Sequence, residues 1–202
     1  MKKLLFLLLI IVSMPSYSQN NSIWLEKGKG DLLAVGEFKD IPNENVFNYL
    51  YAELGISKHN DTRSAYILLS RDQKWWDKHL WIHGELRSFV GKDFSTDNIY
   101  LIGPMFELTS GKIGFINLQT MYRQDKKANY QITVLSDAEY GRMFYSMYAD
   151  VYGSDRVYLH SENRLFFKII PHIRVGANIL ISSGEGNGDF YVKPMAVIRV
   201  DL

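Results

Sequence analysis

Cysteine is missing from all 202 residues of the chain, and its absence excludes two features. No disulfide bond can stabilise the fold, even in a compartment that permits disulfides. A lipid-modified cysteine cannot anchor the protein either. An excess of charge of one sign is also missing, because 23 basic residues stand against 22 acidic ones. This balance gives no indication of a nucleic-acid partner.

Long apolar runs are missing everywhere except at the amino terminus. Lys2 and Lys3 precede an apolar run from Leu4 to Val12, and Ser16-Tyr17-Ser18 then supplies small residues at the cleavage positions. This order is typical of a secretory signal peptide, and the run is about half as long as a spanning helix. We therefore expect cleavage after Ser18, which leaves 19–202 as a single domain. If that domain spans a membrane, it must do so with strands.

What the rest of the chain has is a hydrophobic period of two, which is typical of strands with two different faces. In 172–182, Arg174 and Asn178 belong to the polar face. The alternate, apolar positions of this segment are Ile173, Val175, Ala177, Ile179 and Ile181. The segment 189–202 repeats the pattern.

The same pattern predicts twelve strands, or ten if the weakly patterned first segment does not pair. Most strands from residue 46 onward would be about 10 to 14 residues long, whereas soluble sheets usually use about 5–6. A tilted strand needs roughly 9–11 residues to cross a bilayer, so the length favours a membrane protein. The expected strands are 22–28, 31–39, 46–57, 63–73, 79–89, 98–109, 112–123, 129–138, 142–151, 156–168, 172–182 and 189–202.

The expected connections alternate in length, as they do between the two ends of an outer-membrane barrel. Connections such as 183–188 and 90–97 are longer and would lie outside the cell, whereas 169–171 and 110–111 would be periplasmic turns. Aromatic residues near the strand ends would form an interfacial girdle. These are Trp75, Trp76, Trp81, Tyr100, Tyr122, Tyr145 and Tyr152.

The fold class that fits these patterns is an all-β, transmembrane, antiparallel up-and-down β-barrel. A soluble barrel also alternates, but it turns its apolar face inward around a ligand. Here the aliphatic faces of 173–181 and 192–202 run over whole strands with few polar interruptions. Strands that face lipid must pair on both edges, so the sheet has to close.

The chain resembles the nucleoside-specific channel-forming Tsx-like outer-membrane proteins, particularly a small branch without an assigned function. The resemblance covers about 30–202 and implies a monomeric 12-stranded barrel with a narrow channel, through which Tsx itself passes nucleosides. The segments that carry it are Ala65-Tyr66 through Trp75-Trp76, His83-Gly84-Glu85-Leu86, Tyr100-Leu101-Ile102-Gly103, Leu118-Gln119-Thr120-Met121-Tyr122 and Phe166–Asn178.

The function that we expect is passive passage of a small polar solute through the bacterial outer membrane, without an enzymatic reaction or a cofactor. The partners would be outer-membrane lipid, the solute and, during biogenesis, the assembly machinery. A non-conducting structural barrel and a lipid-modifying barrel enzyme stay open as alternatives. Strand parity gives the candidate lumen and solute-contact residues: Tyr51, Glu53, Arg71, His83, Glu85, Arg87, Arg123, Asp150, Glu162, Arg164 and Arg174.

Three other motifs favour ordinary structural roles, so we predict no catalytic or metal-binding residues. His160 and Ser161 are neighbours on a strand and point to opposite faces, which excludes a catalytic triad. His79 and His83 would lie roughly 13 Å apart along a strand, too far for a common metal ion. The segment 183–189 lacks the alternating oxygen ligands of a calcium loop, and we expect a flexible outer loop there.

Overall fold

The computed structural model describes residues 21–29, 31–57, 62–76, 79–90, 96–110, 113–124, 128–153, 157–183 and 190–202. The expected signal peptide at 1–18 and most of the segment 183–189 lie outside these residues. Within the described part of the chain, no helix is long and apolar enough to cross a membrane.

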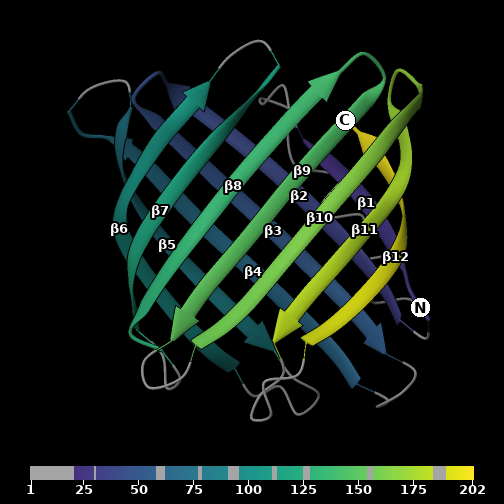
Figure 1. Cartoon of the computed structure of the whole chain (residues 1–202), viewed down its shortest axis with the longest axis horizontal. Helices are drawn as coiled ribbons and strands as arrows, with labels where there is room; N and C mark the ends of the chain where they lie inside the picture. Colours follow the sequence, from purple (N-terminus) through teal and green to yellow (C-terminus); the bar gives the residue numbers. More distant parts are fainter. Residues whose placement is uncertain are drawn as a thin grey trace.

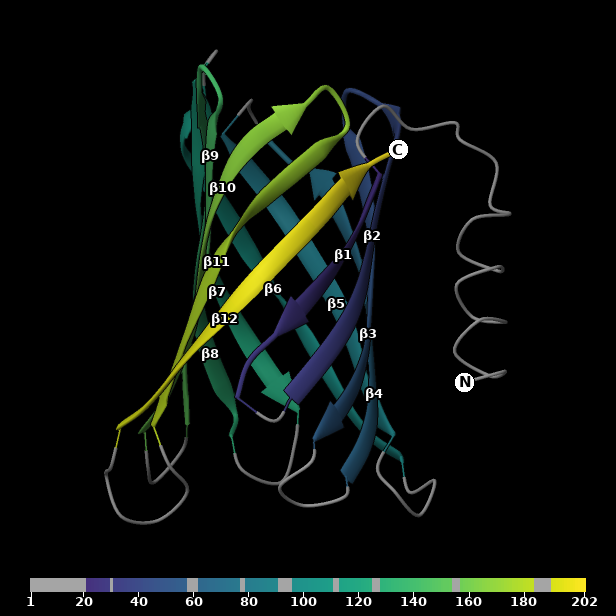
Figure 2. The same ribbon diagram turned by 90° about the vertical axis from the view of Figure 1, so that its right-hand side faces the viewer.

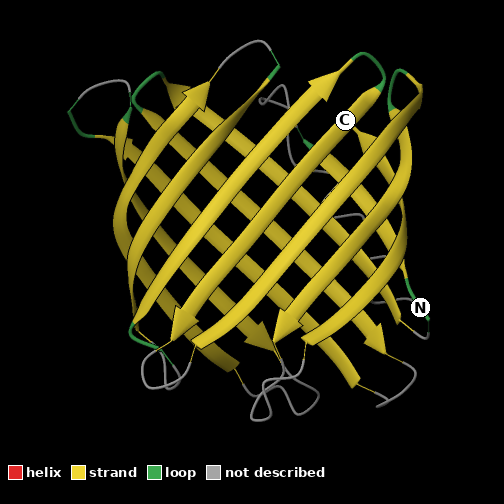
Figure 3. Cartoon of the chain, viewed as in Figure 1, coloured by secondary structure: helices red, strands yellow, loops and turns green. Residues whose placement is uncertain are grey.

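The described chain forms one closed antiparallel barrel of twelve tilted strands, in which each strand pairs with its neighbours in sequence and β1 pairs with β12 (Figures 1 and 3). The predicted fold class and the count of twelve strands are confirmed. The strands are β1 (Ser22–Lys27), β2 (Asp31–Asn43), β3 (Val46–Ser57), β4 (Thr62–Lys74), β5 (Leu80–Val90), β6 (Thr96–Ser110), β7 (Gly114–Gln124), β8 (Tyr130–Tyr140), β9 (Met143–Gly153), β10 (Val157–Ile170), β11 (Ile173–Ser183) and β12 (Phe190–Asp201).

The two ends of the barrel differ in their connections. At the end where β1 begins and β12 ends, three turns have only two residues, at 44–45, 141–142 and 171–172, and the other two connections are 75–79 and 111–113. The opposite end carries connections of three to six residues, at 28–30, 58–61, 91–95, 125–129, 154–156 and 184–189 (Figure 2). Gly141 has a φ of 60° in its two-residue turn, a conformation that tight hairpins need and that glycine adopts without strain. The predicted asymmetry in connection length is confirmed.

The outward face of the barrel is apolar along most strands. Side chains from β4, β6, β8, β11 and β12 point away from the barrel at every second position. Examples that are at least two-fifths exposed are Ile67, Leu69, Ile102, Ile132, Ile179 and Ile198. A soluble barrel would have placed these side chains inside. Apolar side chains that alternate toward the outside are instead expected for contact with hydrocarbon.

Aromatic residues flank this apolar face close to the strand ends. Trp75, Trp76, Tyr100 and Tyr122 are exposed, as the expected girdle requires. The girdle prediction is wrong for Trp81 and Tyr152, which lie on the lumen side. Lys74 lies over the ring of Trp81, and Arg123 lies over the ring of Tyr152, both within the barrel.

The inward face contains the buried core. One cluster joins Trp24, Tyr51 and Phe166 with the aliphatic residues Val35, Leu68 and Val197. A second cluster contains Ile99, Leu101 and Met121. Buried polar and charged side chains share the inward face with both clusters.

Candidate functional site

The structure places ten of the eleven predicted lumen residues on the inward face. They are Tyr51, Glu53, His83, Glu85, Arg87, Arg123, Asp150, Glu162, Arg164 and Arg174. Their contact with a solute stays a prediction, because side-chain direction alone does not test it.

The prediction is wrong for Arg71, which is exposed on the outward face of β4. It pairs with Asn48 on β3 and with Gly84 on β5, both of which belong to the outward set. The apolar run Ile67-Leu68-Leu69 in the middle of β4 obscures the alternation, so the pattern gave the wrong parity. The inward positions of this strand include Ser70 and Asp72.

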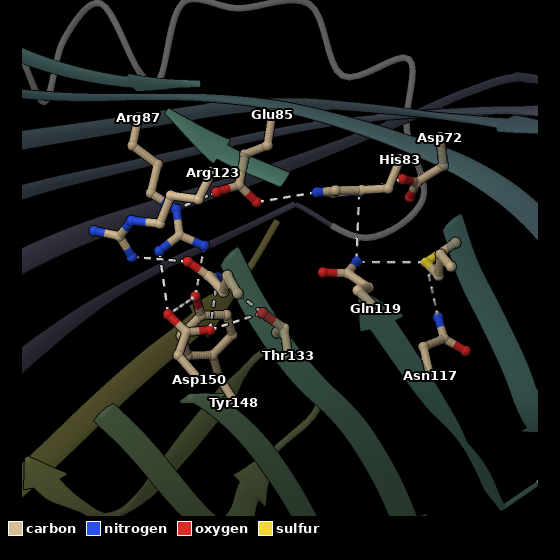
Figure 4. A network of polar contacts seen from close by, with 12 residues as sticks. Asp72, His83, Glu85, Arg87, Asn117, Gln119, Arg123, Thr133, Tyr148 and Asp150 are labelled. Atoms are coloured by element: carbon tan, nitrogen blue, oxygen red, sulfur yellow. Dashed lines mark hydrogen bonds and ion pairs between the residues drawn. The ribbon is translucent and has the colours of Figure 1, made fainter. Parts of the chain in front are cut away.

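A polar network extends over β4 to β9 on the lumen side, and we name it the His83 network (Figure 4). Its members that Figure 4 labels are Asp72, His83, Glu85, Arg87, Asn117, Gln119, Arg123, Thr133, Tyr148 and Asp150. Gln131 belongs to it as well, through its hydrogen bonds to Arg123, Thr133 and Asp150.

His83 lies between two carboxylates and connects β4 with β5. Its Nδ1 lies 2.5 Å from Asp72 Oδ1, and its Nε2 lies 3.2 Å from Glu85 Oε2. The imidazole is only 3% exposed. Both ring nitrogens therefore have acidic partners, an arrangement that fixes the ring orientation.

Arg87 continues the network from β5 to β9. Its Nε contacts Glu85, its Nη1 lies 3.2 Å from Asp150 Oδ2, and its Nη2 donates to Tyr148 Oη over 2.7 Å. The guanidinium group thus has an acceptor on each of its three nitrogens. Charge-assisted hydrogen bonds of this kind are the stronger ones in a protein interior.

Asp150 is the acceptor on which several side chains converge. Thr133 Oγ1 donates over 2.8 Å and Gln131 Nε2 over 3.0 Å to Oδ1, while Tyr148 Oη donates over 2.5 Å to Oδ2. Gln131 Oε1 in turn accepts from Arg123 Nη1 at 2.8 Å. Gln131 and Thr133 are fully buried, so their hydrogen-bonding groups are satisfied by side chains and not by bulk water.

A second network surrounds Glu26 on β1, and we name it the Glu26 network. Glu26 Oε1 accepts from Trp24 Nε1 at 2.8 Å and from Arg164 Nε at 2.9 Å, and Oε2 accepts from Asn178 Nδ2 at 2.8 Å. Arg164 also pairs with Glu162 on its own strand. Glu26 is 1% exposed, and these donors compensate for the burial of its charge.

A third group of charges lies at the end of the barrel where β1 begins and β12 ends. Asp201 accepts from Arg174 Nε at 2.7 Å and from Arg199 Nε at 2.8 Å. The Arg199 guanidinium lies over the rings of Trp24, Phe144 and Phe166, with 5.3 to 5.7 Å to their centroids. Cation–π contact and ion pairing therefore act on the same side chain.

The candidate lumen residues did not include four members of these networks, Glu26, Asp72, Asn178 and Arg199, although the alternation placed Asn178 on a polar face. Glu26 lies on the short strand β1, whose alternation is weak, although Trp24 and Glu26 share a face two residues apart. Asp72 is the neighbour of Arg71, so the wrong parity of Arg71 excludes it from the lumen. The inward positions of Asn178 and Arg199 do have a sequence signal, because both residues alternate with aliphatic residues.

The motifs that resemble enzyme or metal sites behave as strand geometry requires. His160 and Glu162 share the inward face, with 3.2 Å between Nε2 and Oε1. Ser161 points outward and accepts from Asn163 Nδ2 at 2.9 Å. Among the described residues, no three His, Cys, Asp or Glu side chains are grouped so that they could hold a metal ion.

A closed barrel with an apolar outer face and a charged lumen defines a class, the porin-like transmembrane β-barrels. No protein-family model matches the chain, and no curated protein sequence matches it. The resemblance to the Tsx-like family therefore has no support from these comparisons.

Solved structures do match the fold. The KdgM porin in complex with disordered oligogalacturonate has a TM-score of 0.61 at 9% identity, and the match covers 91% of this chain and 99% of that chain. The NanC porin also has a TM-score of 0.61, at 7% identity, with 92% and 99% covered. The protein therefore has the fold of an outer-membrane porin. At these identities the likeness extends to the fold alone.

Proposed function

We propose that the protein is a passive channel of a bacterial outer membrane for small polar solutes without net charge. The observation that carries the proposal is the orientation of the side chains: aliphatic side chains point outward and hydrogen-bonding side chains point inward. Such a wall can exchange hydrogen bonds with a passing solute while lipid surrounds the outer face. The proposal requires no cofactor and no chemical step.

The pairing of lumen charges supports solutes without net charge. Six basic side chains of the lumen have a carboxylate within 4 Å: Lys39, Arg87, Arg164, Arg174, Lys193 and Arg199. Pairing of this kind weakens the attraction that each of these basic side chains would otherwise exert on anions. Nucleosides are the first candidates, because they are uncharged and because the sequence resembles the Tsx-like family. KdgM, whose structure contains oligogalacturonate, shares the fold with this chain but not a demonstrated substrate.

The location and partners belong to the same proposal. The segment 1–18 would direct export and be removed, the assembly machinery would insert the monomeric barrel, and outer-membrane lipid would cover the aliphatic face. The longer connections would then face the outside of the cell, and both termini would be periplasmic. Mass spectrometry of the protein purified from outer membranes tests the cleavage, with residue 19 expected as the first residue.

Liposome swelling tests the channel itself. Vesicles that contain the protein should swell in nucleosides, small sugars and zwitterionic amino acids faster than vesicles without it. Swelling rates that do not depend on the protein would remove the channel and leave the barrel standing.

Planar bilayers test the charge balance of the lumen. With a potassium chloride gradient, the wild type should show a reversal potential close to zero. Glu85→Gln removes a carboxylate and leaves Arg87 partly uncompensated, so the potential should move toward chloride selectivity. A strongly cation- or anion-selective wild type would contradict the proposed solute class.

A non-conducting structural barrel is the second candidate, and one observation favours it. Gln131, Thr133 and Asn178 are 0% exposed although they point into the lumen, and the core clusters occupy the same space. Such a plugged barrel would show neither conductance nor swelling. The two candidates thus predict opposite results in the same vesicles.

A further inference from the structure

Arg87 crosses the lumen to a strand that is not its neighbour. Three strands, β6, β7 and β8, separate β5 from β9 in the barrel wall. The Arg87 guanidinium nevertheless lies 3.2 Å from Asp150 Oδ2 and 2.7 Å from Tyr148 Oη, both on β9. Figure 4 shows the side chains meeting away from the wall. We name these three residues the Arg87 bridge.

Other side chains hold both ends of the bridge in place. On β5, Glu85 contacts Arg87 Nε and is itself bonded by His83. At the β9 end, Thr133 and Gln131 of β8 donate to Oδ1 of Asp150. A fully satisfied buried network is rigid, so the bridge is a fixed element of the lumen and not a transient surface contact.

The space on the near side of the bridge is filled. The wall segment between β5 and β9 carries the cluster of Ile99, Leu101 and Met121, whose exposed fractions are 8%, 3% and 4%. Close-packed apolar side chains leave no path for a polar solute there. A solute must therefore pass on the far side of the bridge, towards β10 and β1.

Contacts continue from the bridge on that far side. The Tyr148 ring packs edge-on against His160 on β10, with 6.1 Å between centroids. His160 bonds Glu162, Glu162 pairs with Arg164, and Arg164 reaches Glu26 on β1. Side-chain contacts thus connect β5 with β1 by way of β9 and β10. Within this series of contacts, the bridge is the step that spans the most strands of the wall, because β6, β7 and β8 lie between its two ends.

We propose that the Arg87 bridge is the constriction of the channel and determines the size limit of the solutes that pass. The proposal rests on the channel function proposed above. A solute passes on the far side of the bridge, where it can exchange hydrogen bonds with the Arg87 guanidinium and the Tyr148 hydroxyl. The bridge is anchored on β5 and on β9, so the distance from it to the facing wall limits the width of the passage.

The test is a double variant, Arg87→Ala/Asp150→Ala, which removes the bridge without leaving either partner of the ion pair alone. The matched control is Lys193→Ala/Asp31→Ala, which also deletes one basic and one acidic lumen side chain. Lys193 on β12 and Asp31 on β2 pair next to the wall, with only β1 between their strands. Circular dichroism and the mobility of unboiled samples on gels verify that each variant is folded.

Single-channel conductance and the swelling of liposomes in a trisaccharide relative to a monosaccharide are the readouts. The bridge variant should conduct at least about twice as well as the wild type and admit the trisaccharide, since pore width controls both. The control should match the wild type. A Tyr148→Phe variant, which keeps the ring and removes one acceptor, should give an intermediate conductance.

Each outcome decides the proposal. A folded bridge variant with wild-type conductance overturns the constriction and leaves the channel standing. A silent wild type with a conducting bridge variant supports the bridge as the obstruction and contradicts passage through the unmodified barrel. If both proteins are silent, the constriction and the channel are both wrong.

Discussion

Arg164 and Glu26 are 138 residues apart in the sequence, and their side chains meet inside the barrel with 2.9 Å between Nε and Oε1. Two strands, β11 and β12, lie between them in the wall. The contact exists only because β1 pairs with β12 and closes the sheet. It therefore connects the closure of the barrel with the chemistry of its lumen.

Removal of Arg164 should destabilise the barrel strongly. Arg164→Ala leaves the buried Glu26 carboxylate without its cation, and we expect a loss of about 3–5 kcal/mol in the free energy of unfolding. Urea titration of the protein in lipid vesicles, followed by tryptophan fluorescence, measures the loss. A matched pair, Arg164→Met/Glu26→Gln, should recover most of it, because neither charge remains.

Arg71 provides the control for this prediction, since it is an arginine on the exposed outward face. Arg71→Ala should change the free energy of unfolding by no more than about 0.5 kcal/mol. If Arg164→Ala and Arg71→Ala change the free energy of unfolding by the same amount, the cross-lumen pair of Arg164 and Glu26 does not stabilise the barrel as described.

A lysine should be far more costly on one face of β11 than on the other. Ile179 points outward at the middle of the strand, and a lysine at the bilayer midplane costs about 2–4 kcal/mol. Leu180 points inward and pairs across the strands with Glu162, so Leu180→Lys gains an acidic neighbour. Unfolding in vesicles compares the two variants; equal costs would contradict the assignment of faces.

Two glycines on neighbouring strands should respond differently to the addition of one methyl group. A Cβ at Gly103 would lie 2.8 Å from Met121 Cα and against the Thr120 carbonyl, so Gly103→Ala should cost about 1–3 kcal/mol. At Gly84 the nearest atom is Arg71 O at 4.0 Å, which is an ordinary contact. Gly84→Ala should be neutral or stabilise the strand by up to about 1 kcal/mol, through the smaller entropy of the unfolded chain. Melting temperatures that fall equally for both variants would exclude the close approach of β6 and β7.

The sequence predicts the strands well because one rule, alternation between lipid and lumen, acts on almost every residue. The segment 172–182 shows this, and the structure places the strand at Ile173–Ser183. The prediction for 31–39 ends too early. In the structure β2 continues to Asn43, with a register shift against β3 between Asp40 and Asn43.

The lumen contacts could be predicted only in part. Parity assigned Arg87, Asp150, Arg164 and Glu162 to the inward face, but parity does not tell which inward residues meet. That depends on the closure and stagger of the barrel, which bring β5 to β9 and β10 to β1. Where neighbouring residues on both faces of a strand are apolar, as around Leu68 on β4, the sequence does not show even which residues point inward.

The most direct test of the whole account is an accessibility scan along β11, for which the absence of cysteine makes every introduced thiol unique. Single cysteines at 175, 177, 178, 179 and 180 would carry a nitroxide in the refolded, membrane-bound barrel. We predict that oxygen dissolved in the lipid relaxes the labels at 175, 177 and 179, while the labels at 178 and 180 are protected from it. Protection at the odd positions, or the absence of any alternation, would contradict a barrel whose aliphatic side chains face hydrocarbon.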